Sequence, residues 1–416
     1  MNPTQLPPNV PILLDGRPVE KITAFLFGKG GHDDPQVLLA NQNKSFQGSI
    51  VLGMGFTFDD SNPEATPMAE MHRLIEKDPR NAECIFPYIG GDEVNSSPTH
   101  AHRRYVIDFF DRSEEEAWQW PDLMQIVKDK VKPIRDVQKR DALRERWWQY
   151  AEKRPGLVRA IAECDRVLVV PRVTTYSSFT FLPHNMVYSE MLVVIANPNY
   201  STFSILQSYI HEIWARFFSS TLGDGLRYTP SDCFETFPFP ENWETNPTLE
   251  AIGKTYYDYR ADLMVQNNQG LTDTYNRFHD PHEDDPALLK LRDLHSQMDR
   301  AVLEAYGWPD LETTCGFALD YLDIDPEDVP AQAQERVESG NFFFETAAEA
   351  AAFDVLIRSH QARRGKLPWR YKWPEAIHDD VLARLLDLNQ TRYDEEIRLG
   401  LHGKTSQSGK ETRFFL

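Results

Sequence analysis

The stretch Phe86-Pro87-Tyr88-Ile89-Gly90-Gly91-Asp92-Glu93-Val94-Asn95, followed by Arg104-Tyr105-Val106-Ile107-Asp108-Phe109, decides how this chain is interpreted. An aromatic residue and a proline lead into a glycine pair, and polar side chains and an alternating strand come next. A sheet edge presents short polar groups to a partner in this way. We therefore expect a turn at the glycine pair and a strand over residues 105–110, and the pattern favours recognition over chemistry.

Length and composition indicate a globular protein. The chain has 416 residues, 41% hydrophobic and 12% aromatic, which is enough to bury one large core or a few smaller ones. No leader pattern and no window of about 18 uninterrupted apolar residues is present, so we expect a cytoplasmic protein. Cys84, Cys164, Cys233 and Cys315 lie far apart without a Cys-x-x-Cys pair, which favours reduced thiols over a zinc site or a disulfide frame.

The net charge of −20 is unevenly distributed along the chain. Residues 241–330 hold 20 acidic and 6 basic side chains, whereas residues 128–154, here called the basic segment, hold 10 basic and 5 acidic ones. Because salt screens interactions beyond about 10 Å, a basic segment in an acidic protein can still meet a phosphate backbone. The alternative is a solvated amphipathic helix whose charges pair with one another at i,i+4 spacing.

The hydrophobic periodicity predicts an α+β fold: a mixed-sheet domain followed by a mainly helical C-terminal region. The expected segments are a connector at residues 1–60, the mixed domain at 61–240, an acidic helical domain at 241–330 and a helical tail at 331–416. Helices are expected near 68–77, 113–129 and 202–222, strands at 22–27, 166–173, 178–182 and 191–196, and a long basic helix after Pro133. Further helices are expected at 256–267 and 286–306, joined by a connection at 270–276, and at 346–361 and 379–398, with a disordered tail at 403–410.

Motifs for methyl transfer are incomplete. A cofactor turn needs glycines at defined spacing, and amino methylation needs an Asp/Asn-Pro-Pro-aromatic loop. Phe27-Gly28-Lys29-Gly30-Gly31 fails the G-x-G-x-x-G spacing. Asn197-Pro198-Asn199-Tyr200 has Asn199 where the second proline belongs, so we interpret it as a strand-turn-helix corner. We expect no cofactor on this chain.

Metal and phosphate-loop motifs are incomplete as well. His211-Glu212 does not begin an H-E-x-x-H motif, because Ala215 stands at the second histidine position. The run of residues 279–285 is rich in His, Asp and Glu, but consecutive loop residues rarely converge on one ion, which favours a solvated loop. Residues 403–411 miss the phosphate-loop register. We expect no catalytic residue and no metal site.

Several runs, in their order and spacing, resemble the target-recognition region of the MmeI-like (type IIG/IIL) DNA methyltransferases of restriction-modification systems. Besides the opening stretch, the runs are Lys130-Val131-Lys132-Pro133-Ile134-Arg135, Arg146-Trp147-Trp148, residues 167–172, residues 208–215 and residues 228–238. Residues 291–308 resemble the helical domain that follows that region. The resemblance implies that residues 61–240 are a DNA target-recognition domain and that the catalytic half is missing from this chain.

Reading base edges needs polar side chains that are held rigidly at a groove, and phosphate contacts need Arg, Lys and hydroxyl groups around them. The candidates for base reading are Asn95, Arg103, Arg104, Arg172, Thr174, Tyr176, His184 and Asn185, and the candidates for phosphate contact are Lys130, Lys132, Arg135, Lys139, Arg140 and Arg144. For each base-reading candidate alone, an ordinary surface role is the alternative. His211 has two open interpretations, a DNA contact or a buried histidine beneath the recognition sheet. Trp147, Trp148 and Trp214 are expected to fill the core.

The resemblance implies a sequence-specific recognition module that docks a DNA duplex, reads a short site in the major groove and positions an adenine for extrusion. The active site and its S-adenosylmethionine would belong to a separate catalytic methyltransferase subunit, in a type II restriction-modification system that serves phage defence. Two alternatives stay open: a degenerate or complete S-adenosylmethionine-dependent methyltransferase, and an interaction protein that docks through its acidic helices without touching DNA. Titration with S-adenosylmethionine and duplex binding at low salt would separate them.

Overall fold

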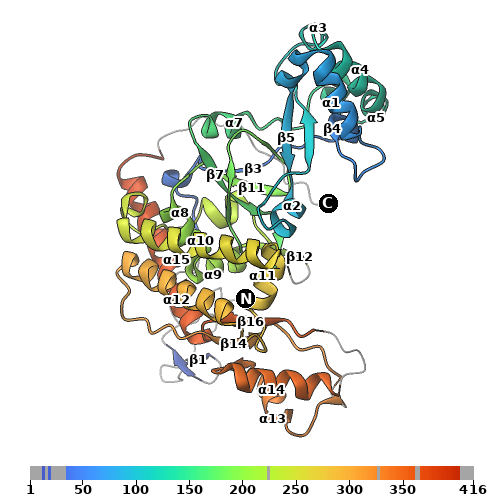
Figure 1. Cartoon of the computed structure of the whole chain (residues 1–416). Helices are drawn as coiled ribbons and strands as arrows, with labels where there is room; N and C mark the ends of the chain where they lie inside the picture. The colour runs from blue at the N-terminus through green and yellow to red at the C-terminus, as the bar shows by residue number, and fades with distance from the viewer. Residues whose placement is uncertain are drawn as a thin grey trace, which may run out of the picture.

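The computed structural model describes residues 12–14, 17–19, 34–222, 225–325, 328–360 and 366–402. These residues form the α+β fold that the sequence predicts, with a mainly helical region after residue 241 (Figure 1). Within these ranges no helix is long and apolar enough to cross a lipid bilayer. The expected strand at 22–27, the glycine-rich run at 27–31 and the tail at 403–411 lie outside the described residues.

A mixed sheet and several short helices form the part of the molecule at the upper right of Figure 1. The strands, in sheet order, are β10 (Val187–Tyr188), β5 (Ile85–Ile89), β6 (Arg104–Ile107) and β4 (Thr57–Phe58); β10 pairs with β5 in parallel and the other pairs are antiparallel. The helices are α1 (Met68–Lys77), α3 (Glu114–Ala117), α4 (Pro121–Lys130), α5 (Lys132–Asp136) and α6 (Asp141–Glu145). Their buried apolar side chains form one core, which includes Trp147 and Trp148 as predicted.

A second, antiparallel sheet lies at the centre of the molecule. Its strands, in order, are β3 (Ser45–Gln47), β11 (Leu192–Ile195), β7 (Arg166–Pro171) and β9 (Thr180–Pro183). The two inner strands are buried almost throughout, which is why their sequences are continuous apolar runs without alternation. A small third sheet, in the order β12 (Ser220–Leu222), β13 (Gly225–Arg227) and β8 (Val173–Thr174), continues from the end of β7.

Helices cover the central sheet and share its core. They are α7 (Pro155–Ile161), α8 (Tyr200–Gln207), α9 (Tyr209–Phe218), α10 (Pro247–Asn267), α11 (Leu271–Phe278) and α12 (Pro286–Tyr306). Apolar residues of β7, β11 and α8–α12 form one hydrophobic cluster, which includes Trp214 as predicted. The packing therefore runs without a break across residue 240, and the expected division into segments stays a prediction.

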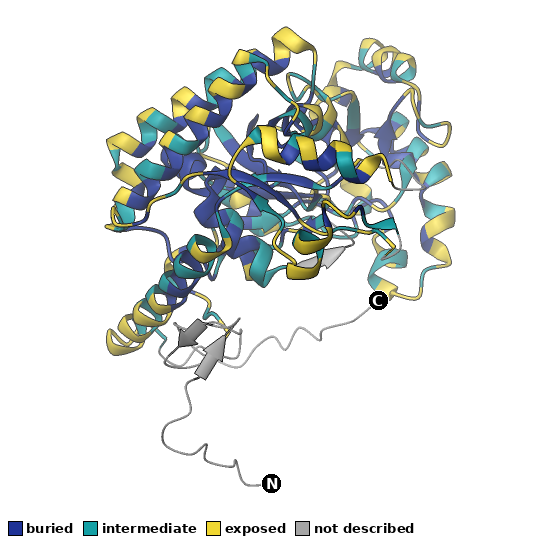
Figure 2. Ribbon diagram, turned by 90° about the horizontal axis from the view of Figure 1, so that it is seen from below, coloured by how far each residue is buried: buried dark blue, intermediate teal, exposed yellow. Residues whose placement is uncertain are grey.

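The C-terminal region adds a three-stranded sheet and three helices. The sheet order is β15 (Phe343–Phe344), β14 (Gly316–Leu319) and β16 (Trp369–Lys372), and the helices are α13 (Gln334–Ser339), α14 (Ala347–Arg358) and α15 (Glu375–Arg398). A hairpin of β1 (Ile12–Leu14) and β2 (Arg17–Val19) completes the described strands. The long helix α15 returns to the central core through residues such as Leu382 and Leu385. Figure 2 shows buried strands in the middle and helices with exposed outer faces around them.

The structure corrects several predicted elements. The glycine pair does not form an open turn, because Gly91 begins a short helix, α2 (Gly91–Ser96), in which the Glu93 carboxylate accepts from the Gly90 N–H at 3.1 Å. The basic segment is not one long helix: α4, α5 and α6 are separate, since Pro133 stands at the start of α5 and Arg140 is extended. Ser208 is extended as well, so the expected helix at 202–222 is two helices and a strand.

Two further predictions are corrected by helix ends. The expected helix at 113–129 is interrupted between α3 and α4, where Trp120 leaves the helical conformation. The expected connection at 270–276 is largely helix α11. Gly270 explains why this helix packs so closely, since a Cβ at this position would lie 2.3 Å from the carbonyl oxygen of Asn95 on α2.

Candidate nucleic-acid interface

Three arginines that are distant in the sequence lie together at one end of the central sheet. Arg172 follows β7, Arg227 ends β13 and Arg154 caps α7. The Arg172 N–H donates to the Met191 carbonyl at 2.7 Å, and the Arg172 carbonyl accepts from the N–H of the residue after Arg227 at 2.8 Å. We call Arg154, Arg172 and Arg227 the arginine cluster. The two backbone hydrogen bonds therefore fix the position from which the Arg172 side chain extends.

The arginine cluster is a concentration of positive charge that the protein leaves largely unneutralised. Burial lowers the pKa of Arg172, and the charges of Arg227 and Arg154 lower it further, while Glu190 acts in the opposite direction. Within the described part of the chain, the side chains of Arg172 and Arg227 make no hydrogen bond or ion pair. Arg154 donates only to neutral oxygens, at 3.3 Å. An anion bound here would relieve the mutual repulsion of the three guanidinium groups.

Helix α2 lies beside the arginine cluster, since a Cβ on Gly91 would lie 3.7 Å from the Pro171 side chain. Behind α2, Arg104 donates from Nε and Nη2 to the Glu93 carboxylate at 2.6 and 2.8 Å, and Glu93 is only 2% exposed. Arg103 is exposed and pairs with the exposed Asp92 at 2.7 Å, and its Nε lies 3.6 Å from the Glu93 carboxylate. Arg104 is therefore committed to holding α2 in place, whereas Arg103 faces solvent.

The remaining base-reading candidates separate into different places. Asn95 lies partly exposed on α2. His184 and Asn185 are exposed in the turn after β9, beside Arg166, and thus at the end of β7 opposite Arg172. The structure therefore does not bring this pair to the arginine cluster.

Thr174 and Tyr176 point into the protein. The buried Thr174 hydroxyl donates to the Tyr176 carbonyl at 2.8 Å. The Tyr176 hydroxyl donates to Asn276 at 2.8 Å, and its ring stacks on His279 at 4.8 Å. Their prediction as base-reading residues finds no support in this arrangement, because both side chains already have protein partners.

His211 and Arg135 are corrections to the predicted interface, because both are fully buried. His211 Nε2 lies 2.9 Å from the Tyr228 hydroxyl, and burial lowers the His211 pKa to about 3. Of its two open interpretations, the buried histidine is correct. The Arg135 guanidinium donates to the Val51 and Gln149 carbonyls at 2.9 and 3.3 Å. Neither side chain reaches the surface where DNA would lie.

The other cations of the basic segment are accessible but mostly paired with neighbouring oxygens. Lys130 donates to the Glu64 and Ala65 carbonyls, Lys132 pairs with Asp136 at 2.8 Å, Arg140 with Glu152 at 3.0 Å, and Arg144 with Asp141. Lys139 is exposed and has no ion pair within the described ranges. Two of these pairs have the i,i+3 or i,i+4 spacing that the alternative interpretation expects. Because exposed pairs are worth little, a phosphate can replace the carboxylate.

The corner at residues 197–200 has the predicted geometry. It joins the end of β11 to the start of α8. The Asn197 side chain accepts from the Asn199 N–H at 2.9 Å. Arg166 closes the corner by donating to the Pro198 carbonyl at 2.7 and 2.9 Å, with its guanidinium 4.2 Å from the Tyr200 ring centre. The polar groups of this corner are thus occupied by local structural contacts.

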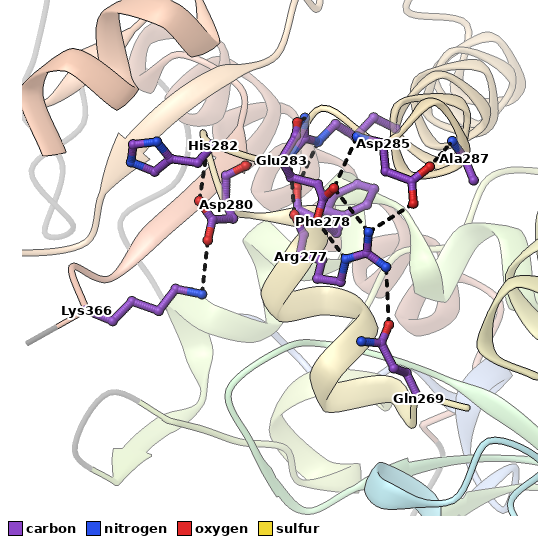
Figure 3. Close-up of polar contacts among 10 residues, drawn as sticks. Gln269, Arg277, Phe278, Asp280, His282, Glu283, Asp285, Ala287 and Lys366 are labelled. Carbon is purple, nitrogen blue, oxygen red and sulfur yellow. Dashed lines mark hydrogen bonds and ion pairs between the residues drawn. The ribbon is translucent and has the colours of Figure 1, made fainter. Parts of the chain in front are cut away.

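The acidic run at residues 279–285 is held by ion pairs (Figure 3). Arg277 donates to Glu283 at 2.6 Å and to Asp285 at 3.0 Å, and Lys366 pairs with Asp280 at 3.3 Å. In the described part of the chain, the side chains close enough together to hold a metal ion are Glu375, His378 and Asp379, outside this run. The run is therefore more ordered than the solvated loop that we expected.

Half of the chain matches one known family. Residues 33–241 match the family described as MmeI, target recognition domain. The chain belongs to this MmeI family. All three members of the arginine cluster, and α2 beside them, fall within the matched residues.

Two known proteins are similar to this MmeI-family chain over part of their length. A stretch of 146 residues is 27% identical to DNA methyltransferase A of Bacillus subtilis (strain 168), covering 33% of this chain and 15% of the relative. The fold is similar to the structure of the type IIL restriction-modification enzyme MmeI in complex with DNA, with a TM-score of 0.50 and 18% identity, over 81% of this chain and 39% of that one. The chain thus spans less than half the length of either protein. The shared fold extends past the family match into the C-terminal region.

Two members of the arginine cluster were missed among the sequence candidates. Arg227 directly precedes the run at 228–238 that carries the family resemblance, and Arg154 is the last residue of the basic segment. Both positions were visible in the sequence. Only the pairing of β13 with β8 brings Arg227 to Arg172, and no spacing along the chain signals that contact.

Proposed function

We propose that this chain is a sequence-specific DNA recognition module of a restriction-modification system. The arginine cluster is the single observation that supports it best: within the described ranges its three arginines form no ion pair, and they lie together inside the part that matches the MmeI target recognition domain. An arginine held rigidly by its backbone can donate two parallel hydrogen bonds to guanine O6 and N7 or to a phosphate.

In this proposal the three arginines have different tasks. Arg172 is half-buried and starts from the backbone of the central sheet, so it reads a base edge. Arg227 is exposed, and Arg154 lies beside Gly48 at the sheet edge; these two contact phosphates on either side. Asn95 on α2, and Arg103, which pairs with Asp92 of α2, extend the contact.

The basic segment supplies the outer phosphate contacts. Lys139 makes no ion pair with any described residue, and Lys132, Arg140 and Arg144 would exchange a neighbouring carboxylate or carbonyl for a phosphate. Contacts of this kind add affinity that falls with salt and carries no sequence information. The central sheet would thus select the site, and the basic segment would hold the duplex.

We further propose that methyl transfer to adenine is carried out by a separate catalytic subunit, which binds S-adenosylmethionine. The relative that is similar to part of this chain is named as a DNA methyltransferase, which supports methyl transfer as the reaction of the system. Such a system would act on DNA in the cytoplasm. Host DNA methylation with and without a co-expressed catalytic subunit tests it, since the same motif should be modified only when both polypeptides are present.

Selection from a random duplex library tests DNA recognition directly. The purified chain is expected to enrich a short motif at low salt, and Arg172→Gln is expected to lose or relax one position of that motif. Arg144→Gln is the matched control, because it removes a cation of the basic segment and should leave the motif unchanged. Recovery of no motif by the wild-type chain, together with no duplex binding, would contradict the proposal.

A further inference from the structure

A pocket of about 90 Å³, whose largely apolar lining is interrupted by several charged side chains, lies between α9, the strand β16 and the first turn of α15. Its walls include Glu212 and Arg216 from α9, His279 after α11, Asp320 after β14, and Arg370 and Lys372 from β16. No member of the arginine cluster lines it. The pocket is therefore a separate place on the molecule from the proposed DNA interface.

Arg370 is the unusual member of the pocket wall. It is 6% exposed, and its Nε donates to the Asp320 carboxylate at 2.7 Å. Its Nη1 is buried and has no hydrogen-bond partner among the residues that the structure describes. A buried charged donor without an acceptor is costly, so the wall of the pocket includes a residue with a buried donor for which the described part of the chain supplies no acceptor.

Lys372 adds a second donor to the same side of β16. Residues two positions apart on a strand point to the same face, which brings the Lys372 ammonium to the side of the sheet that carries the Arg370 side chain. Lys372 is partly exposed and makes no hydrogen bond or ion pair within the described ranges. Arg216, by contrast, is occupied by Glu212 at 2.7 Å and by the Thr175 carbonyl at 2.8 Å.

The charge balance of the wall is positive. Arg216, Arg370 and Lys372 face the two carboxylates of Glu212 and Asp320, which leaves one positive charge in excess. Burial holds the pKa of His279 well below its usual range, and Arg370 and Arg216 lower it further, so its imidazole is neutral. Its Nδ1 accepts from the Tyr371 N–H at 2.9 Å, and the ring proton is therefore on Nε2, which is a donor.

We propose that this pocket binds a small oxyanion, a phosphate or a carboxylate group, between Arg370 and Lys372. A volume of about 90 Å³ corresponds to roughly three water molecules in the liquid, which suits such a group. The oxyanion supplies the acceptors that the Arg370 and Lys372 donors lack. Its negative charge matches the excess charge of the wall. The proposal does not depend on DNA recognition by the arginine cluster.

Calorimetric titration of the full chain with inorganic phosphate, and separately with acetate, at constant ionic strength in sodium chloride, tests the site. We expect saturable binding of at least one of the two anions. The tighter anion identifies the ligand as a phosphate or as a carboxylate. Lys372→Gln and Arg370→Lys are each expected to weaken binding by about tenfold or more, because each removes or displaces a charged donor.

Two control variants keep the result interpretable. Lys366→Gln removes an exposed lysine six residues before Lys372 that pairs with Asp280 outside the pocket, and it should bind the anion like the wild type. Arg172→Gln should also retain anion binding, whether or not it still reads DNA. Should Arg370→Lys fail to fold, Lys372→Gln decides. The absence of saturable binding for both anions, or unchanged binding by Lys372→Gln, would overturn the proposal.

Discussion

The arginine cluster and the basic segment both carry positive charge, but they use it differently. In the basic segment the cations stand on short helices and are mostly paired with neighbouring carboxylates and carbonyls. In the arginine cluster, Arg172 and Arg227 have no such partner within the described ranges, and the pairing of β13 with β8 holds Arg227 close to Arg172. The number of basic residues in a stretch therefore does not measure how many of them are free to bind a ligand.

Rigidity separates the two regions as well. The backbone of Arg172 is bonded on both sides, to Met191 and to Tyr228, so its side chain starts from a fixed point. Discrimination between bases needs such fixed donors, whereas attraction to phosphate does not. We therefore assign specificity to the arginine cluster and sequence-independent affinity to the basic segment.

The largest expected effect is on stability, and it distinguishes an arginine that supports the fold from an exposed one. Arg104→Ala would leave the 2%-exposed Glu93 carboxylate without its bidentate partner, and we expect a loss of about 3–5 kcal/mol in the free energy of unfolding. Urea denaturation measures this loss. The adjacent Arg103→Ala breaks an exposed pair with Asp92 and a longer contact of 3.6 Å with Glu93. Because Glu93 keeps its bidentate partner Arg104, this variant should cost no more than about 1 kcal/mol. Equal losses in the two variants would show that Glu93 does not depend on Arg104.

The second prediction tests whether the arginine cluster, and not the basic segment, provides sequence specificity. Arg172→Ala should reduce discrimination between the recognised duplex and a single-base variant by about 1–3 kcal/mol, the value of one bidentate contact. Fluorescence anisotropy with the two duplexes measures it. Arg172→Lys, which keeps the charge but loses the fork of donors, should recover affinity and not discrimination. If the lysine variant recovered discrimination in full, the paired donors of the Arg172 guanidinium would not be needed to read a base.

Sequence reasoning succeeded for the regular elements of the fold. The predicted α+β class is confirmed. Buried strands such as β7 and β11 could be recognised in the sequence because they are continuous apolar runs. Helix α12 begins after Asp285, whose side chain accepts from the Ala287 N–H, and ends at Gly307 in the left-handed region, so both ends carry ordinary capping signals. The corner at 197–200 was also predicted correctly.

The failures have physical causes that a linear pattern does not contain. The Glu93 side chain folds back to the Gly90 N–H and turns an expected loop into α2. Arg135 and His211 carry polar atoms that indicate a surface, but tertiary carbonyl and hydroxyl partners allow both to be buried. Arg227 reaches Arg172 only through strand pairing.

The third prediction concerns the support beneath the arginine cluster. Burial lowers the pKa of His211 from 6.5 to about 3, so the unfolded chain takes up a proton that the folded protein cannot. Stability therefore falls as pH decreases from about 6.5 towards about 3, by about 2 kcal/mol for this group between pH 7 and pH 5. In His211→Gln, which keeps a polar group near Tyr228, the loss of stability between these two pH values should be smaller by that amount.

The control for this prediction is His184→Gln, because His184 is exposed and should not change the pH dependence. Urea denaturation at pH 7 and pH 5 is the measurement for both variants. Comparing each variant with itself removes any loss caused by the substitution at neutral pH. An unchanged pH dependence in His211→Gln would mean that His211 is not shielded from protons in the folded state.

The smallest expected effect belongs to the basic segment. Lys132→Ala, Arg140→Ala and Arg144→Ala should each weaken duplex binding by less than about 1 kcal/mol, equally for all sequences, since each cation already has a protein partner. Binding measured over a range of salt concentrations should show a slope reduced by about one per lost phosphate contact. If one of these variants changed the recognised motif, the basic segment would contribute to sequence specificity, contrary to this prediction.

The most direct test of the account is the affinity of the purified chain for its selected duplex and for a shuffled duplex of equal composition, in the wild type, Arg172→Ala and Arg144→Ala. The account predicts that the wild type and Arg144→Ala prefer the selected duplex by the same factor, and that Arg172→Ala loses about tenfold or more of that preference. A wild-type chain that binds both duplexes equally, or a preference that survives in Arg172→Ala, would contradict it.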